Sequence, residues 1–522
     1  MTPTKESAKN DSRYIDRPFN IRPICFWAFF VVLTIVVCIA FQNRPWWVGV
    51  YFVVLIGMFY GLQFVRPRDA VLQFFGTSRM NFLFTIGLCL AVALSFSITS
   101  LSYTNQKSFA GYDDLSGVVE SFNLDSDGSG WFILGGAKFG SSAVSGKVAV
   151  YVNNPNAATA DAVKSTYRVS VYTQLRTANA NDYNINNGIK YTANLGASES
   201  VVALGADGGV RSVVLRYCQN FLRAHMASER NADLMYAMLL GDRSTLDGDI
   251  SESFSLTGLA HVLSVSGLHV GILVGFLMWL LKFLRVNRRR QVPIIAAVLA
   301  VYCYLCGFRY SILRASIMFL VLAVRRAFLR SNDLLSSVSL AGIVVLVLFP
   351  FSINSASFQL SFACMLGIAL FALPLSNFFE KKAKLPHWLA SAFSMYFATF
   401  LGCLPLMIKY FGFVSVAGVF TNLLFLPLMV LAFQASFLAV VTWVAFPLLY
   451  VVNIVLDVVI SVTQWIASLP FSYVSLAGGG GYWFLLYYVG LVLATRFIFF
   501  RGRWKYSAAA ILILGYGLSM VL

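Results

Sequence analysis

The chain has 522 residues, of which 58% are hydrophobic and 12% are charged, and its formal net charge is +17. Soluble domains carry about a quarter charged residues, so this composition excludes an ordinary soluble protein and predicts a chain that crosses a membrane many times. The positive charge does not indicate a nucleic-acid-binding face, because it falls in short loops between apolar runs, as expected for cytoplasmic loops.

Residues 1–102 predict an N-terminal arm followed by three transmembrane helices near 23–40, 46–65 and 80–99. The arm carries five basic residues before the first apolar run. We therefore place the N-terminus in the cytoplasm, so that the third helix leads to the outer side of the membrane.

Residues 103–210 change character, because Gly, Ser, Asn, Asp and Ala dominate and short alternating runs appear. Apolar residues alternate from Val148 to Val152 and from Tyr167 to Val171, which is typical of strands with one buried face. About five such strands predict a small extracytoplasmic β-barrel of OB type. Seven Lys and Arg against nine Asp and Glu give this segment a charge of −2. Strong DNA binding by the barrel alone is therefore not expected.

Residues 211–257 predict interfacial amphipathic helices, and residues 258–522 predict a transmembrane domain. Since run 416–446 is long and contains Pro427, we expect a broken or re-entrant helix there. About thirteen crossings result in all. Those after residue 257 are expected near 260–283, 291–308, 312–329, 334–350, 358–378, 388–408, 416–446, 449–469, 482–500 and 506–522.

Residues 258–270 read Gly-Leu-Ala-His-Val-Leu-Ser-Val-Ser-Gly-Leu-His-Val and are expected to open an apolar transmembrane helix. Imidazoles and hydroxyls at membrane depth are costly, so they are expected to face a cavity, a neighbouring helix or a substrate path. We favour the polar lining of a path. The alternative is hydrogen bonding between helices, with Gly267 permitting close packing.

The histidines and serines of this segment could in principle bind a metal ion or catalyse hydrolysis. In a helix, His261 and His269 would lie roughly 12 Å apart along the axis, too far to bind one metal ion. No cofactor or metal site is therefore expected. Ser266 and His269 share a helical turn and could act as nucleophile and base, but no orienting acid lies in the span.

Further polar residues lie in or near the predicted spans. Arg314 follows a helix start, and its alternative role is to extend to the outer interface. Asn422 precedes Pro427 in the long run 416–446. Asp457 lies in a later span and has no evident partner in the sequence.

The polar blocks resemble the competence domain of ComEC-type proteins of bacterial natural transformation, in order and spacing, over roughly residues 210–470. The N-terminal helices and the β-rich segment are more loosely similar to the amino-terminal domain of that family. The matching blocks are Leu-Leu-Gly-Asp-Arg (239–243), residues 258–270, Ser-Ile-Leu-Arg-Ala-Ser-Ile-Met (311–318), Asp-Leu-Leu-Ser-Ser-Val-Ser-Leu-Ala (333–341), Ser-Phe-Gln-Leu-Ser-Phe (357–362), Phe-Gly-Phe-Val-Ser (411–415), Asn422 and Pro427.

The resemblance implies a multi-pass channel of the bacterial cell membrane that imports single-stranded DNA, with the OB-like domain outside. It implies an external DNA receptor, a cytoplasmic motor or single-strand-binding protein, membrane lipid and a possible homodimer as partners. The residues expected to line the polar path are Asp242, Arg243, His261, Ser264, Ser266, Gly267, His269, Arg314, Gln359, Ser361 and Asn422.

Many members of that family carry a C-terminal metallo-β-lactamase-like domain, which this sequence does not show. The sequence contains four histidines in total. We therefore expect this chain to be a channel and not an enzyme. Two alternatives stay open, namely a transporter of another polar or anionic solute and an intramembrane hydrolase that uses Ser266 and His269.

Overall fold

The structure, a computed structural model, divides into two compact units. Unit 1 comprises Met1–Ile98, Asn332–Val414 and Ser475–Leu522, and unit 2 comprises Thr99–Ser331 and Ser415–Val474. The residues that the structure describes are 23–42, 46–64, 79–109, 111–124, 129–152, 163–196, 201–263, 265–328, 334–443, 446–476 and 483–494.

Five of the described helices are long and apolar enough to cross a membrane, by length and composition. At 1.5 Å per residue, about 20 residues span the 30 Å hydrocarbon core of a bilayer. These helices confirm a polytopic helical membrane protein. They comprise Leu83–Thr104, Ala356–Lys381, His387–Phe411, Gly418–Thr442 and Leu448–Ala467. The last predicted run, 506–522, lies outside the described residues.

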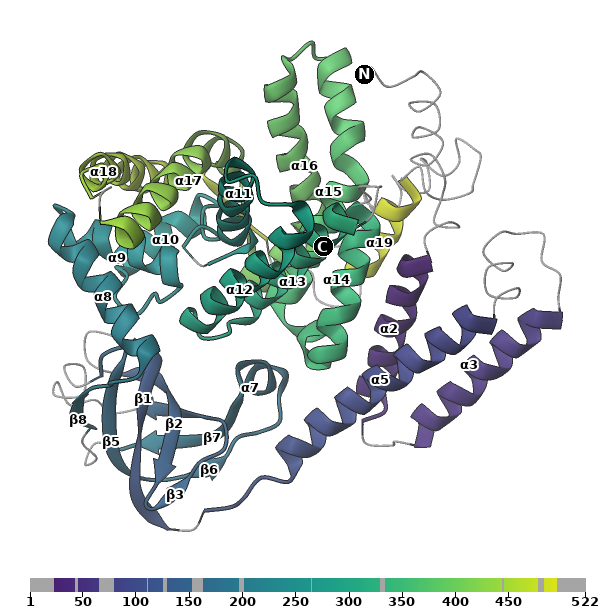
Figure 1. The fold of residues 1–522 in the computed structure, drawn as a ribbon, viewed down its shortest axis with the longest axis horizontal. Coiled ribbons are helices and arrows are strands. Elements are labelled where there is room, and N and C mark those ends of the chain that lie inside the picture. Colours follow the sequence, from purple (N-terminus) through teal and green to yellow (C-terminus); the bar gives the residue numbers. More distant parts are fainter. Residues whose placement is uncertain are drawn as a thin grey trace. The chain divides into compact units, whose positions relative to one another are not determined.

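Unit 1 is helical. Its elements are α2 (Pro23–Ala40), α3 (Trp46–Phe64), most of α5 (Arg79–Thr104), α14 (Leu334–Leu348), the 3₁₀ helix η2 (Pro350–Asn354), α15 (Ala356–Lys381), α16 (His387–Phe411) and α19 (Trp483–Ala494). The longest pair, α15 and α16, lies side by side as a hairpin (Figure 1).

Two glycines allow α15 and α16 to approach closely. A Cβ atom on Gly367 would lie 2.4 Å from the carbonyl oxygen of Ala398, and one on Gly402 would lie 2.4 Å from that of Ala363. Small residues at a membrane helix crossing permit backbone contact that larger side chains prevent. The crossing therefore depends on both glycines.

Residues 111–206 of unit 2 form a β module built on an eight-stranded sheet. Its strand order is β6-β7-β4-β2-β1-β5-β8, with β3 paired to β2. The β4–β7 pair is parallel and the other pairs are antiparallel. The elements are β1 (Tyr112–Leu124), β2 (Gly130–Phe139), β3 (Ser142–Ala143), β4 (Lys147–Val152), β5 (Tyr167–Gln174), β6 (Arg176–Thr177), α7 (Asp182–Asn187), β7 (Ile189–Leu195) and β8 (Val201–Ala206).

The alternation in the sequence correctly predicts the inner face of the β module. Val148, Val150 and Val152 are buried, as are Val169 and Val171 on β5. Burying a Val side chain contributes about 1.5–3 kcal/mol relative to exposure, so this valine-rich face stabilises the module without a disulfide. The described cysteines are all free.

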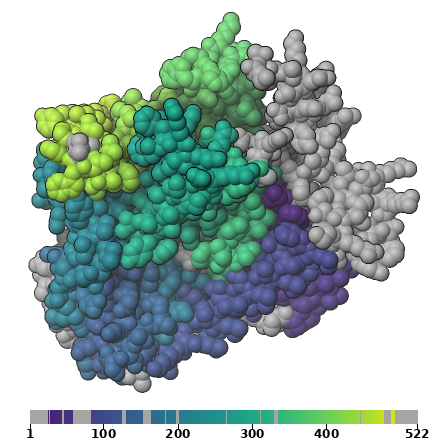
Figure 2. Space-filling view, viewed as in Figure 1, coloured from purple at the N-terminus to yellow at the C-terminus, as the bar shows by residue number. Residues whose placement is uncertain are grey.

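The β module is fastened to α8 (Val210–His225) by Arg216, whose guanidinium donates to the carbonyl oxygens of Thr166 and Asp207 at 3.3 and 2.7 Å. Burial raises the pKa of the Asp207 carboxyl. Hydrogen bonds from Ser212, the Gly209 N–H and Arg168 outweigh this and hold that pKa below its usual value. In the space-filling view the module and α8 form one continuous surface (Figure 2).

After α8 come α9 (Glu229–Leu240) and α10 (Gly248–Leu256). Every residue of α9 from Asn231 to Leu240 is buried. This helix packs with α8, α10, α17 (Gly418–Thr442) and α18 (Leu448–Ala467) around one hydrophobic core. α9 is thus a core helix of unit 2, whereas α8 keeps an amphipathic pattern with buried Leu215, Phe221 and Leu222.

A second core in unit 2 is formed by α11 (Gly267–Phe283), α12 (Arg288–Leu305) and α13 (Tyr310–Phe328). Strands β9 (Phe413–Ser415) and β10 (Tyr473–Ser475) pair where the chain passes between the units.

The predicted break or re-entry in run 416–446 is wrong. Gly418–Thr442 is one continuous helix that contains Pro427. The helix ends before the apolar run 416–446 does, because Trp443 adopts a left-handed conformation with φ 58°. A non-glycine residue rarely continues a helix from that region of backbone space.

We predict that Gly367→Ala lowers the thermal stability of the purified protein in detergent. The added methyl group would force α15 and α16 apart, and overpacking of this kind costs typically about 1–3 kcal/mol. The matched control is Gly275→Ala on α11, where a Cβ meets no atom within 4 Å. Equal melting temperatures for wild type and Gly367→Ala would contradict the close crossing.

Candidate functional site

Residues 257–266 are here named the α10–α11 segment, and those of them that the structure describes, 257–263, 265 and 266, are not helical. The prediction that residues 258–270 open a helix is therefore wrong, since α11 begins only at Gly267 with Ser266 as its N-cap. Gly258 has φ +79°, which turns the chain away from α10. The sequence contains both signals, a glycine after one helix and a serine before the next, but uniform apolarity obscured them.

Side chains from three other elements bind the backbone carbonyls of the α10–α11 segment. A chain that leaves the helix among apolar helices must find donors for its carbonyl oxygens elsewhere. Arg243 supplies two of them and Ser311 of α13 supplies one. The contacts are Arg243 Nε to Leu263 O at 3.1 Å, Arg243 Nη2 to Ala260 O at 3.4 Å, and Ser311 Oγ to Val265 O at 3.1 Å.

Helix α17 supplies two further donors to the segment. Thr421 Oγ1 donates to Thr257 O at 2.7 Å, and Asn422 Nδ2 donates to Gly258 O at 3.4 Å. A Cβ on Gly258 would lie 3.2 Å from Gly418 Cα, so only glycine combines this φ with this approach. Asn422, predicted as a path residue, therefore holds the segment against α17.

Ser266 and His269 meet as their spacing predicts, but their hydrogen bonds begin a helix. The Ser266 N–H donates to His269 Nδ1 at 3.1 Å, and Ser266 Oγ lies 3.2 Å from the same nitrogen. Ser266 Oγ also accepts from the Leu268 N–H at 3.3 Å. This reciprocal pattern is a capping box, with histidine in the place usually taken by Glu or Gln.

His261 of the segment and His269 of α11 have opposite environments. His269 is 1% exposed, and its ring lies 4.9 Å from the ring of Phe433, measured between centroids. The space between His269, Val262 and Met429 is too small for a water molecule. His261, in contrast, is exposed. Of this pair, only His261 has an exposed side chain.

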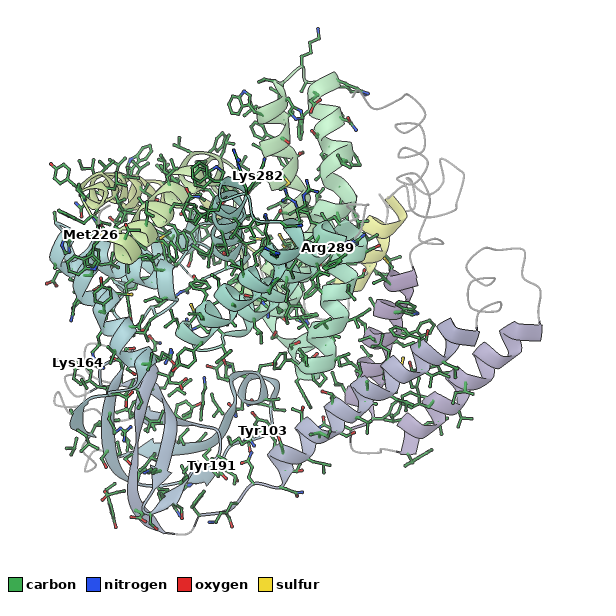
Figure 3. All side chains as sticks on the ribbon, in the orientation of Figure 1. Tyr103, Lys164, Tyr191, Met226, Lys282 and Arg289 are labelled. Atoms are coloured by element: carbon green, nitrogen blue, oxygen red, sulfur yellow. The ribbon has the colours of Figure 1, made fainter. Side chains whose placement is uncertain are left out.

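Asp242 contacts the β module. Its Oδ2 accepts a 2.6 Å hydrogen bond from Ser165 Oγ, and its Oδ1 accepts from the Ser244 N–H at 3.1 Å. Ser165 precedes β5, and its neighbour Lys164 lies where the module meets α8 (Figure 3). The Asp242 carboxylate is 5% exposed, so it connects the module to the α9–α10 loop.

Arg314, on α13, is 1% exposed. It does not extend to a surface, so the alternative of an interfacial side chain is wrong. A Cβ on Gly267 would meet only Ala315 at 3.8 Å, an ordinary contact, so this glycine does not mark a close helix crossing. Gly271 instead makes room for a side chain, because its Cβ would lie 2.7 Å from the tip of the Phe319 ring. Ser264 lies outside the described residues.

Gln359 and Ser361 lie on α15 in unit 1, whereas the other described candidates lie in unit 2. Gln359 Nε2 donates to Ile353 O at 2.9 Å, and Tyr410 of α16 donates to Gln359 Oε1 at 2.9 Å. Gln359 therefore joins η2, α15 and α16. Ser361 is half-buried.

Sequence reasoning missed three polar residues. Arg309 donates to the carbonyl oxygen of Gly241 beside Asp242. Asn231 and Asn453, from α9 and α18, both contact Asp457. The sequence did contain signals for them, since Arg309 directly precedes a helix and Asn453 interrupts an apolar run. Within the described residues, no group of three His, Cys, Asp or Glu side chains could hold a metal ion.

Residues 238–501 match the family described as competence protein, which is half of the chain. The chain belongs to the competence protein family. This family match includes the α10–α11 segment and the residues whose side chains hold it, namely Arg243, Ser311, Thr421 and Asn422.

Curated relatives of this competence-family chain include ComE operon protein 3 of Bacillus subtilis, 29% identical over 216 residues. Recombination protein 2 of Haemophilus influenzae is 26% identical over 210 residues, and competence protein ComA of Neisseria gonorrhoeae is 28% identical over 154. The alignments cover 40%, 37% and 28% of this chain, and 26%, 26% and 22% of the relatives. The chain thus matches about a quarter of their length. No solved structure matches it.

We predict that Ser266→Ala destabilises the protein by about 0.5–2 kcal/mol, the usual cost of removing an N-cap. Ser266→Thr should retain most of the stability, because its hydroxyl can accept the same N–H. Thermal unfolding of the purified variants measures both. If Ala and Thr behave alike, the cap does not stabilise α11.

We predict a coupling of about 1–2 kcal/mol between Ser165 and Asp242, since hydrogen bonds to charged groups are stronger than neutral ones. A double-mutant cycle with Ser165→Ala and Asp242→Asn, followed by urea unfolding in mild detergent, measures it. Additive single-variant effects would show that this contact does not join the module to the loop.

Proposed function

We propose that this competence-family protein is a cell-membrane channel that carries single-stranded DNA inward during natural transformation. The observation that carries the proposal is the α10–α11 segment. Non-helical backbone at membrane depth is stable only where protein buries it or where it lines a watery cavity. The segment has its carbonyls bound by side chains and leaves His261 exposed.

The chemistry of the segment suits a polyanion. Its imidazole and hydroxyl can hydrogen-bond phosphate oxygens, and Arg243 places a positive charge beside the segment. A single basic side chain lowers the barrier for a phosphate, whereas a long basic stripe would hold the strand too tightly. We assign His261, Ser266, Arg243 and Asn422 to this surface. The buried His269 supports its shape.

The β module is proposed to be an OB-like barrel on the outer side of the membrane. The order β7-β4-β2-β1-β5 supports this, together with the parallel β4–β7 pair. Thr173 Oγ1 of β5 lies 3.4 Å from Asn194 O of β7, which brings the two ends of that order together. A closed or nearly closed five-stranded arrangement is the OB-type solution.

We propose about thirteen crossings, a cytoplasmic N-terminus and basic loops on the cytoplasmic side. An external DNA receptor, a cytoplasmic motor or single-strand-binding protein, membrane lipid and a second copy of the chain are the proposed partners. The second candidate function is transport of another anionic solute, because the same segment would suit any small polyanion.

We predict that a transformable host lacking this protein binds DNA at its surface but imports none. His261→Ala should reduce import severalfold without lowering the melting temperature, because the imidazole is exposed. Labelled DNA separates the two steps, since internal DNA resists added nuclease. The matched control is His387→Ala, a second exposed histidine, which pairs with Glu380 in unit 1. Normal import in the deletion strain would reject DNA as the substrate.

A further inference from the structure

Asn231 of α9 meets Asn453 and Asp457 of α18 in a cluster of amides around one carboxylate. Asn231 Nδ2 lies 2.6 Å from Asp457 Oδ1 and 3.0 Å from Asn453 Oδ1. It also lies 3.3 Å from the carbonyl oxygen of Asn453. Asn453 Nδ2 donates to Asp457 Oδ2 at 3.1 Å. Residues 222 or more apart in the sequence are thus joined.

Acceptors outnumber donors in this cluster. The two N–H groups of Asn231 face three oxygens, while its own Oδ1 is buried without a hydrogen-bond partner. Asn231 is 0% exposed, so water does not satisfy that oxygen. A buried unsatisfied acceptor is destabilising, and oxygen-rich clusters of this kind suit a hard cation.

Asp457 is the tenth of the twenty residues of α18, a candidate membrane span, and is itself exposed on that helix. Ile454 and Val458, which lie near it on the same helix, are 49% and 52% exposed, so the surface around the carboxylate is apolar. An ionised carboxylate in apolar surroundings requires a compensating positive charge.

No cation of the described residues pairs with Asp457. On α9, Arg230 pairs with Asp247, and the acid Asp233 pairs with Arg223 of α8. The other titratable groups on helices packed against α18 bring no positive charge, namely Glu229 and Tyr236 of α9 and Asp249 and Glu252 of α10. Helix α17 carries no titratable group. The neighbouring helices therefore leave the carboxylate without a positive partner.

The geometry points to a binding site for one small monovalent cation, a proton or Na⁺, formed by Asn231, Asn453 and Asp457. The cation neutralises the carboxylate and supplies the positive charge that the oxygens of the cluster lack. A proton and Na⁺ satisfy the same need. This site does not depend on DNA being the transported substrate.

The test uses the full chain in phospholipid nanodiscs and dicyclohexylcarbodiimide, which modifies protonated carboxyl groups in apolar surroundings. Mass spectrometry measures the modified fraction of Asp457 in sodium-free choline buffer. Modification that NaCl suppresses and extra choline chloride does not indicates Na⁺. Modification that ignores NaCl and falls as pH rises indicates a proton. Either result supports the site. Glu252 of α10 is also exposed but lies outside the candidate membrane spans. Modification of Asp457 no greater than that of Glu252 overturns the site, as does modification insensitive to both Na⁺ and pH.

Variants assign the effect to the cluster. Asp457→Asn should abolish the modification, and Glu252→Gln should leave Asp457 modified as in wild type. Asn453→Ala should shift the suppressing Na⁺ or proton concentration by about tenfold, as expected from the loss of one strong hydrogen bond. Asn231→Ala should act in the same direction. If both alanine variants remain folded and match wild type, the amides are not part of the site.

Discussion

The fold of unit 2 depends on one constraint, the need of non-helical backbone among apolar helices for hydrogen-bond donors. A helix satisfies its own carbonyls, but residues 257–266 cannot. Arg243, Ser311 and Asn422 therefore come from the α9–α10 loop, α13 and α17 to donate to this segment. These elements are thereby fixed around it, and a small shift of any of them would leave a carbonyl without a partner.

The need for hydrogen-bond partners among apolar helices also explains why most polar residues in this region stabilise the fold. Ser266 and His269 cap α11, and Asp242 holds the β module to the loop that carries Arg243. Burying each of these polar groups in apolar surroundings costs free energy, and a specific hydrogen bond offsets that cost. His261 differs because its side chain is exposed, and a role in binding is consequently assigned to it. The cluster of Asn231, Asn453 and Asp457 differs because the buried Oδ1 of Asn231 has no hydrogen-bond partner.

Sequence patterns predicted the elements well and the polar contacts poorly. Valine alternation identified the buried faces of β4 and β5, and apolar runs located the long helices. Hydropathy nevertheless extended a helix through residues 258–266 and placed a break at Pro427. Both errors have one origin, since average apolarity does not report backbone conformation. Gly258 and Trp443 adopt left-handed conformations, and these end the regular structure.

By itself, the sequence determined that this is a multi-pass membrane protein with a β-rich module, because hydropathy and strand alternation are local properties of the chain. Its short polar blocks also determined the family. Only the tertiary structure decided which polar side chains serve the backbone and which remain available. The physical reason is distance along the chain, since Thr421 binds a carbonyl 164 residues away and Asn231 meets Asp457 across 226 residues. Such pairs have no local signature.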